Sequence, residues 1–137
     1  MLKLLEIETS WQREGNMEEE HNRVMIIDDD GDIRSSLVYA LDSCGFPVTS
    51  CENGTEALLN SMFEEFDYFI TDYDMPGMDG IALVRRLRER FPRAVIIGTS
   101  GKDLGEEFLR AGANDFLRKP FVPYRLAMMI DGGDILA

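Results

Sequence analysis

Cysteine and histidine are scarce in this sequence. Its two cysteines, Cys44 and Cys51, do not have the spacing of a metal site or a redox pair, so we expect two reduced, packed thiols. The single histidine, His21, lies in a polar stretch, and no role is assigned to it. No apolar run is long enough to cross a bilayer, and Glu6 and Glu8 come too early for a signal peptide. We therefore expect a cytoplasmic protein with no membrane partner.

Basic residues are also in short supply. The 14 lysines and arginines stand against 26 acidic residues, which gives a formal net charge of -12. Proteins that bind nucleic acid directly need clustered basic side chains, so this balance argues against such a partner. It suits a protein that gathers cations or docks on a basic partner. A length of 137 residues is typical of one domain with its own core.

Residues 1–22 differ from the rest of the chain and end in a polar, acidic run. Leu4, Ile7 and Trp11 have helical spacing, which would allow one or two amphipathic turns. Short isolated helices are marginal in water, so we expect a leader that is poorly ordered or derived from the expression vector. A short tail is expected over residues 132–137.

Between these segments, over residues 23–131, short apolar runs alternate with apolar residues at helical spacing. The predicted strands cover residues 24–27, 46–51, 66–71, 94–98 and 115–118. The predicted helices cover residues 33–44, 53–62, 79–91, 103–112 and 122–130. Two helix starts carry a capping signal, Asn53 with Glu56 and Asp103 with Glu106. Strict alternation predicts one α/β domain, with a parallel sheet covered by helices on both faces.

Polar side chains follow four of the predicted strands, at the edge where parallel α/β sheets place their chemistry. These candidates are, in chain order, Asp28, Asp29, Asp72, Asp74, Thr99 and Lys119. If the first and third strands are neighbours, Asp28, Asp29 and Asp72 converge and must take up protons or share a cation. A hard divalent ion, Mg²⁺ or Mn²⁺, suits such oxygen ligands. We expect Asp29, Asp72 and the backbone carbonyl of Asp74 to bind it directly, and Asp28 to bind it through water.

A carboxylate beside such an ion can accept a phosphoryl group, which makes Asp72 the candidate acceptor. The ammonium of Lys119 would offset the negative charge of the phosphoryl group, and the Thr99 hydroxyl would donate a hydrogen bond to it. Taken singly, each of these residues could belong to an ordinary turn. Their occurrence in this order, after successive strands, indicates one site.

The stretches VMIIDDDGDIR, YFITDYDMPGMDG, VIIGTSG and DFLRKPF resemble the response-regulator receiver family of two-component systems. The resemblance covers roughly residues 23–131. It implies a flavodoxin-like (CheY-like), doubly wound five-stranded sheet in the order 2-1-3-4-5, and a cis peptide bond before Pro120. It also implies Asp72 as the phosphoacceptor, Thr99 as the switch hydroxyl and Lys119 as the lysine that faces the phosphoryl group.

In this family a switch aromatic residue lies on the fifth strand, and here that residue would be Phe116. The alternative, a plain core role for Phe116, stays open. The resemblance implies that phosphorylation alters the face made by the fourth helix, the fifth strand and the fifth helix. It implies a sensor histidine kinase or a histidine phosphotransfer protein as the phosphodonor, an unknown downstream protein, and a homodimer as one arrangement. Such a domain is not a conventional enzyme, but promotes its own aspartyl phosphorylation and dephosphorylation.

Two other classes remain as alternatives. Asp72 and Asp74 after an apolar strand also resemble the start of haloacid-dehalogenase-type phosphatases, although that motif would open the fold and be followed by further site residues. A receiver-like module that docks without being phosphorylated is the second alternative. The complete set of site residues argues against it.

Overall fold

Five parallel strands form one sheet in the computed structural model, which describes residues 22–131. The strands are β2 (Val24–Ile27), β3 (Val48–Cys51), β4 (Tyr68–Asp72), β5 (Val95–Ser100) and β6 (Asp115–Arg118). Their order across the sheet is β3-β2-β4-β5-β6, so the predicted order 2-1-3-4-5 is confirmed. The predicted tail and, apart from Asn22, the predicted leader lie outside the described residues.

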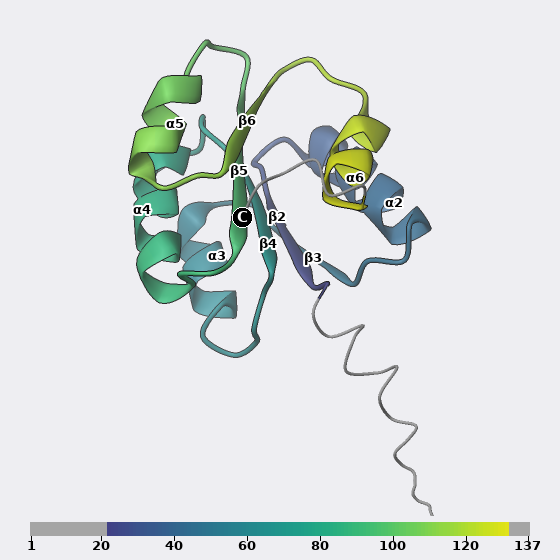
Figure 1. Ribbon diagram of the computed structural model, residues 1–137, viewed down its shortest axis with the longest axis horizontal. Helices are drawn as coiled ribbons and strands as arrows, with labels where there is room; N and C mark the ends of the chain where they lie inside the picture. Colours follow the sequence, from purple (N-terminus) through teal and green to yellow (C-terminus); the bar gives the residue numbers. More distant parts are fainter. Residues whose placement is uncertain (1–21, 132–137) are drawn as a thin grey trace, which may run out of the picture.

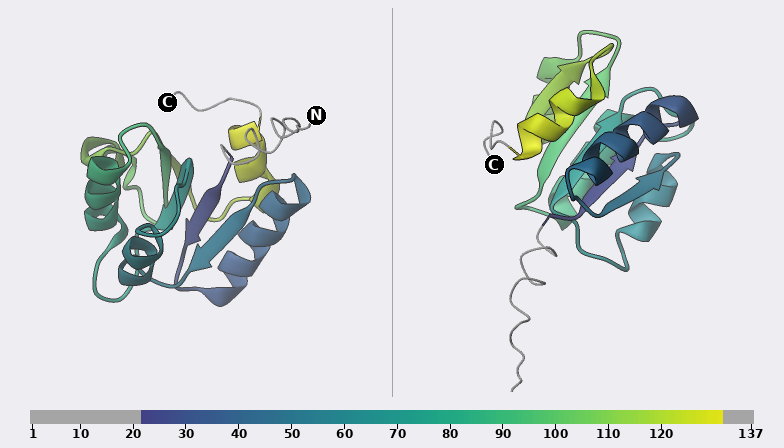
Figure 2. Two further views of the ribbon diagram at one scale, coloured as in Figure 1. Left: turned by 90° about the horizontal axis from the view of Figure 1, so that it is seen from below. Right: turned by 90° about the vertical axis from the view of Figure 1, so that its right-hand side faces the viewer.

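Five helices alternate with the strands and cover both faces of the sheet (Figure 1). They are α2 (Gly31–Ser43), α3 (Gly54–Asn60), α4 (Gly80–Arg90), α5 (Gly105–Ala111) and α6 (Pro123–Asp131). Figure 2 shows α3, α4 and α5 on one side of the sheet, and α2 and α6 on the other. Within residues 22–131, no helix combines the length and the apolar character that crossing a membrane requires.

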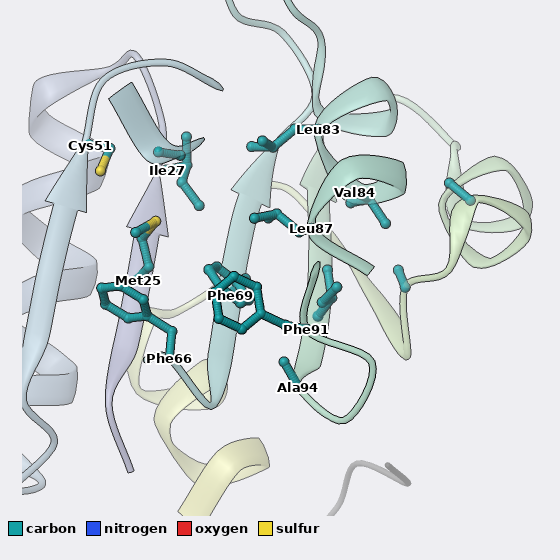
Figure 3. Close-up of a cluster of buried hydrophobic side chains, with 14 of the residues drawn as sticks. Met25, Ile27, Cys51, Phe66, Phe69, Leu83, Val84, Leu87, Phe91 and Ala94 are labelled. Atoms are coloured by element: carbon teal, nitrogen blue, oxygen red, sulfur yellow. The ribbon is translucent and has the colours of Figure 1, made fainter. Parts of the chain in front are cut away.

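The core has two halves, one on each face of the sheet. Strand β2 divides its side chains between them, with Met25 and Ile27 facing α3 and α4 while Val24 and Ile26 face α2 and α6. All four side chains are completely buried, which explains why this strand is an unbroken apolar run rather than an alternating one. Figure 3 shows the first half, where the rings of Phe69 and Phe91 pack with their centroids 5.0 Å apart.

Capping side chains fix where most of the helices begin. The Asn53 side chain accepts a hydrogen bond from the backbone N–H of Glu56 at 2.8 Å, as predicted for the start of α3. The same prediction for Asp103 is wrong. The residue that precedes α5 is Leu104, and it makes no side-chain capping hydrogen bond. Gly112 ends α5 with a φ of 120°, the left-handed region that favours glycine.

Three apolar residues that the helical spacing directed inward are exposed instead. Met62 lies beyond α3, which ends at Asn60, and Val122 precedes α6, so neither follows the periodicity of its helix. Cys44 is the C-cap of α2 and is exposed, whereas Cys51 is buried at the end of β3. Both thiols are free, but the expectation that both are packed is wrong for Cys44. Each of the three residues lies just outside its helix, Met62 and Cys44 after the last helical residue and Val122 before the first.

Two glycines allow helices to approach the sheet closely. A Cβ atom at Gly80 would lie 2.1 Å from the backbone oxygen of Asp72, so only glycine lets α4 begin directly against the end of β4. A Cβ atom at Gly98 would lie 2.2 Å from the ring of Phe108, so β5 needs a glycine there to admit the ring from α5. Both close approaches involve the carboxyl-terminal halves of the neighbouring strands β4 and β5.

Candidate functional site

Acidic side chains from two neighbouring strands meet at the carboxyl edge of the sheet. Strands β2 and β4 pair in parallel with Ile27 opposite Thr71, so the residues that follow, Asp28 and Asp72, are also neighbours. One carboxylate oxygen from each of Asp28, Asp29 and Asp72 lies within 4.8 Å of the others. This is the arrangement that the sequence predicted for the three side chains. We call these three residues the carboxylate cluster.

Lys119 bridges two members of the carboxylate cluster. Its Nζ lies 2.9 Å from Oδ1 of Asp72 and 3.0 Å from Oδ2 of Asp28. The backbone N–H of Lys119 donates to the carbonyl of Ser100 at 2.8 Å, which holds the residue beyond the end of β6. The peptide bond from Lys119 to Pro120 is cis, as the resemblance implied. A residue that follows the last strand is thereby brought into contact with side chains at the carboxyl ends of the first and third strands.

Burial and charge act against each other within the cluster. Asp28 is 1% exposed and Asp72 is 5% exposed, whereas Asp29 faces solvent. Burial raises the pKa of Asp72, and the hydrogen bond from Lys119 offsets part of that rise. Burial alone would lower the pKa of Lys119, but its hydrogen bonds to Asp72 and Asp28 outweigh burial and leave that pKa raised. Lys119 is therefore an ammonium at neutral pH.

Thr99 lies beside Asp72, because the two residues are register partners on β5 and β4. Thr99 is buried, and its carbonyl accepts a hydrogen bond from the N–H of Tyr73 at 3.0 Å. Phe116 on β6 packs elsewhere, with its ring centroid 5.6 Å from that of Phe108 on α5. The structure thus places Thr99 at the cluster, and Phe116 against the helix that precedes β6.

The side chain of Asp74 is not part of the carboxylate cluster. It is largely exposed, and its Oδ1 lies 3.4 Å from Nζ of Lys102. The same Nζ lies 5.3 Å from the centre of the Tyr73 ring. The sequence prediction for Asp74 concerns its backbone carbonyl and not this side chain.

A family model described as the response regulator receiver domain matches residues 24–131. The match spans every strand and helix of the described structure. The chain belongs to the response regulator receiver domain family.

Curated relatives of this receiver domain include transcription regulators that are longer than it is. The transcriptional regulatory protein FixJ of Bradyrhizobium diazoefficiens is 38% identical over 112 residues, an alignment that covers 79% of this chain and 54% of FixJ. The DNA-binding transcriptional regulator NtrC of Escherichia coli is 41% identical over 101 residues, covering 72% of this chain and 22% of NtrC. The chain therefore spans about half the length of FixJ and less than a quarter of NtrC.

Solved receiver structures share the whole fold. The chemotaxis response regulator CheY4 of Vibrio cholerae superposes with a TM-score of 0.75 at 28% identity, covering 80% of this chain and 96% of that one. The response regulator TrrA of Thermotoga maritima, solved in complex with Mg²⁺-BeF, gives a TM-score of 0.74 at 26% identity, covering 81% and 97%. The fold and family of this chain thus rest on independent agreement of sequence and structure.

Asp28 of the carboxylate cluster is held by two residues, Arg34 and Asp30, that the sequence analysis did not assign to the site. Arg34 on α2 donates from Nη1 to the carbonyl of Asp28 at 2.6 Å, and the N–H of Asp30 donates to Oδ1 of Asp28 at 3.0 Å. Asp30 also caps α2 by accepting hydrogen bonds from the N–H groups of Asp32 and Ile33. The capping role could have been found, because an aspartate directly before a helical pattern is a start signal. The Arg34 contact depends on how a long side chain folds back, and sequence spacing does not reveal it.

The donor set of the carboxylate cluster fits a hard divalent cation. All three groups offer carboxylate oxygens, which such cations prefer. Lys119 occupies one oxygen each of Asp72 and Asp28, which leaves the other oxygen of Asp72 and both oxygens of Asp29 for a cation. An acidic pocket of this receiver can therefore hold a metal ion.

Proposed function

We propose that this receiver domain takes part in a phosphorelay, by accepting a phosphoryl group on Asp72 from a sensor histidine kinase or a histidine phosphotransfer protein. One observation carries the proposal. A single ammonium, that of Lys119, contacts two buried carboxylates at the ends of neighbouring strands, with Asp29 beside them. The negative charge of this pocket can be balanced by a bound cation, and the Lys119 ammonium can offset the charge of a phosphoryl group added to Asp72.

The proposed cofactor is Mg²⁺, or Mn²⁺ in its place. Asp29, Asp72 and the backbone carbonyl of Asp74 would hold the ion directly, and Asp28 would hold it through water. When bound, the ion supplies positive charge to the phosphoryl oxygens. The TrrA complex with Mg²⁺-BeF supports this assignment, because that protein shares the fold and the family.

The side chains of the receiver would then divide the remaining work. An oxygen of Asp72 forms the bond to phosphorus as the bond from phosphorus to the donor's histidine nitrogen breaks. The ammonium of Lys119, already 2.9 Å from Asp72, offsets the added negative charge. The hydroxyl of Thr99 donates to a phosphoryl oxygen. In dephosphorylation a water oxygen would form the bond to phosphorus as the bond from phosphorus to the Asp72 oxygen breaks, which releases inorganic phosphate. The domain would thereby promote its own phosphorylation and dephosphorylation, without being a conventional enzyme.

The proposed output is a change of shape on the α5–β6–α6 face. Thr99 would move toward the phosphoryl group, and Phe116 would turn inward behind it. The present position of Phe116 supports a link to α5, because a Cβ atom at Gly105 would lie only 3.3 Å from the Phe116 ring. A downstream protein, or a second copy in a homodimer, would bind this face.

How the domain signals within a longer protein is a further part of the proposal. The relatives FixJ and NtrC are named as transcription regulators, and this chain aligns with only part of each. We propose that residues 22–131 signal to another domain or protein in the cytoplasm and do not contact nucleic acid themselves. The net charge of -12 supports this division.

Labelling with acetyl phosphate in the presence of Mg²⁺ tests the proposal. The wild-type chain should gain the mass of one phosphoryl group in intact-mass spectrometry, and Asp72→Asn should gain none. Asp42→Asn is a matched control, because Asp42 is an exposed aspartate on α2 outside the carboxylate cluster. It should be labelled as the wild type is.

Each alternative class gives a different result. No labelling of the wild type, with metal present, would favour a docking module that is not phosphorylated. Labelling that survives in Asp72→Asn would move the acceptor to another aspartate. Rapid turnover of many small phosphate esters would favour a phosphatase.

A further inference from the structure

An apolar patch at the C-terminal end of α3 lies outside the carboxylate cluster and has no part in the proposed function. Leu59, Met62 and Phe63 are 55%, 60% and 76% exposed, and they lie within five consecutive residues. Exposed apolar side chains that lie close together on a soluble domain are typical of a binding surface. We call these three residues the α3 patch.

A groove with basic residues adjoins the α3 patch. It lies between α3 and α4, which are neighbours in Figure 1, and has a volume of about 510 Å³. Its lining residues are Thr55, Leu58, Leu59, Met62, Arg86, Glu89 and Arg90. Among the described residues, no ion pair uses Arg86 or Arg90. Arg90 donates from Nη2 to the carbonyl of Ser61 at 3.5 Å, which is a neutral partner. In a chain with a net charge of -12, the two guanidinium groups are therefore local positive charge that no carboxylate of residues 22–131 pairs with.

The N-terminal segment, residues 1–21, joins the domain close to the α3 patch. The N–H groups of Asp67 and Tyr68 both donate to the carbonyl of Arg23, at 2.9 and 3.2 Å. Asp67 follows Phe63 by four residues, which span at most about 14 Å. A segment of 21 residues can reach on the order of 70 Å, so the whole groove is within its range.

The composition of the N-terminal segment complements the groove. Leu4, Ile7 and Trp11 share one helical face, and the segment carries six glutamates against one lysine and one arginine. We propose that residues 1–21 bind the groove between α3 and α4 of the same chain, with the apolar face on the α3 patch and glutamates beside Arg86 and Arg90. A short helix is marginal alone in water, but packing on an apolar surface supplies the stabilisation that it lacks.

The single tryptophan, Trp11, lies in the N-terminal segment and reports on this contact directly. Acrylamide should quench its fluorescence several-fold less in the wild type than in the wild type unfolded in urea. Phe63→Ser should restore most of the quenching, because it removes the most exposed ring of the patch. Tyr39→Ser is the matched control, since Tyr39 is 70% exposed on α2 at the opposite face of the sheet, and it should change nothing. Equal quenching in the folded wild type, the unfolded chain and Phe63→Ser would overturn the proposal.

Charge exchange tests the pairing with the groove. Arg86→Glu should increase quenching of Trp11, and adding Glu8→Arg should bring it back toward the wild-type value. Quenching that is the same in wild type and Arg86→Glu would contradict the electrostatic part of the proposal.

Protein concentration distinguishes a segment bound to its own chain from a segment supplied by a second copy. Binding within one chain predicts protection of Trp11 that does not change with concentration, together with a monomer in sedimentation velocity. Protection that appears only with a dimer would show that a second copy supplies the segment, and the proposal for the same chain would be wrong. None of these readouts depends on labelling of Asp72, so the two proposals fail separately.

Discussion

Both ends of strand β6 are held by a cation, but the two cations have different partners. Before the strand, Arg88 donates to the side-chain oxygen of Asn114 at 2.7 Å. The same guanidinium also donates to the backbone oxygens of Phe91, Pro92, Ala94 and Gly112. After the strand, Lys119 contacts two carboxylates, those of Asp28 and Asp72.

The difference separates what stabilises the fold from what serves the site. All acceptors of Arg88 are neutral, so the contact satisfies polar groups without creating repulsion between them. The acceptors of Lys119 carry like charges, and Asp29 adds a third carboxylate that Lys119 does not contact. The end of β6 at Lys119 therefore keeps negative charge, which a cation would lower and a phosphoryl group would raise. The end at Arg88 has only neutral acceptors and therefore contributes to the fold and not to the site.

Replacement of Arg88 should have the largest effect on stability. Arg88→Leu removes hydrogen bonds that join the end of α4 to the loops before β5 and β6, and leaves several carbonyl groups without a partner. We expect a loss of about 3 kcal/mol in the free energy of unfolding, measured by urea denaturation. Arg85→Leu, an exposed position on the same helix, should change it by less than about 0.5 kcal/mol. Equal losses in the two variants would contradict the assigned role of Arg88.

Replacement of Lys119 should have a smaller effect that depends on conditions. Lys119→Met leaves Asp28 and Asp72 without their counter-ion, and we expect a loss of about 2 kcal/mol at pH 7 without metal. Added Mg²⁺ or a pH low enough to protonate the carboxylates should recover most of the loss, because either relieves the repulsion. The same treatments should not rescue Arg88→Leu. Rescue of both variants, or of neither, would remove the distinction between the two ends of β6.

Neutralising Asp72 should stabilise the metal-free protein. Burial raises the pKa of this carboxyl, so its contribution to stability is present at low pH and lost as the pH rises through that pKa. Asp72→Asn should therefore raise the melting temperature at pH 7, and the gain should fade as the pH falls into the acid range. Thermal unfolding of both proteins across pH, without metal, measures this. A gain that stays constant at all pH values would show that the charge of Asp72 is not its cause.

The exposed ion pair beside the site should have the smallest effect. Lys102 and Asp74 are both largely open to solvent, and such pairs are screened by water and salt. Lys102→Ala should change the free energy of unfolding by less than about 0.5 kcal/mol, in low or high salt. A larger loss in urea denaturation would mean that the exposed Lys102–Asp74 pair stabilises the protein as much as the buried pairs of Lys119 do.

Much of the fold follows from the sequence, because strands buried on both faces are continuous apolar runs. The helices between them have apolar residues at helical spacing. The pattern failed at helix ends. Met62 continues an apolar series past the end of α3, and Val122 extends one ahead of the start of α6. Periodicity alone does not give the residue at which a helix begins or ends. Asp103 failed as a cap because α5 begins one residue later than the capping signal requires.

The order of the candidate site residues was also readable, since the carboxyl ends of parallel strands meet at one edge. The sequence could not give the contact of Lys119 with both Asp28 and Asp72, the hold of Arg34 on the Asp28 carbonyl, or the cluster of acceptors around Arg88. Each depends on where the tip of a long side chain lies in three dimensions, and no periodicity fixes that position.

The most direct test of the account is to locate the phosphoryl group itself. Borohydride reduces an aspartyl phosphate to homoserine, so peptide mass spectrometry after acetyl phosphate, Mg²⁺ and borohydride identifies the residue that carried it. We predict homoserine at position 72 and at no other aspartate position. Homoserine at Asp28 or Asp29, with Asp72 unmodified, would contradict it.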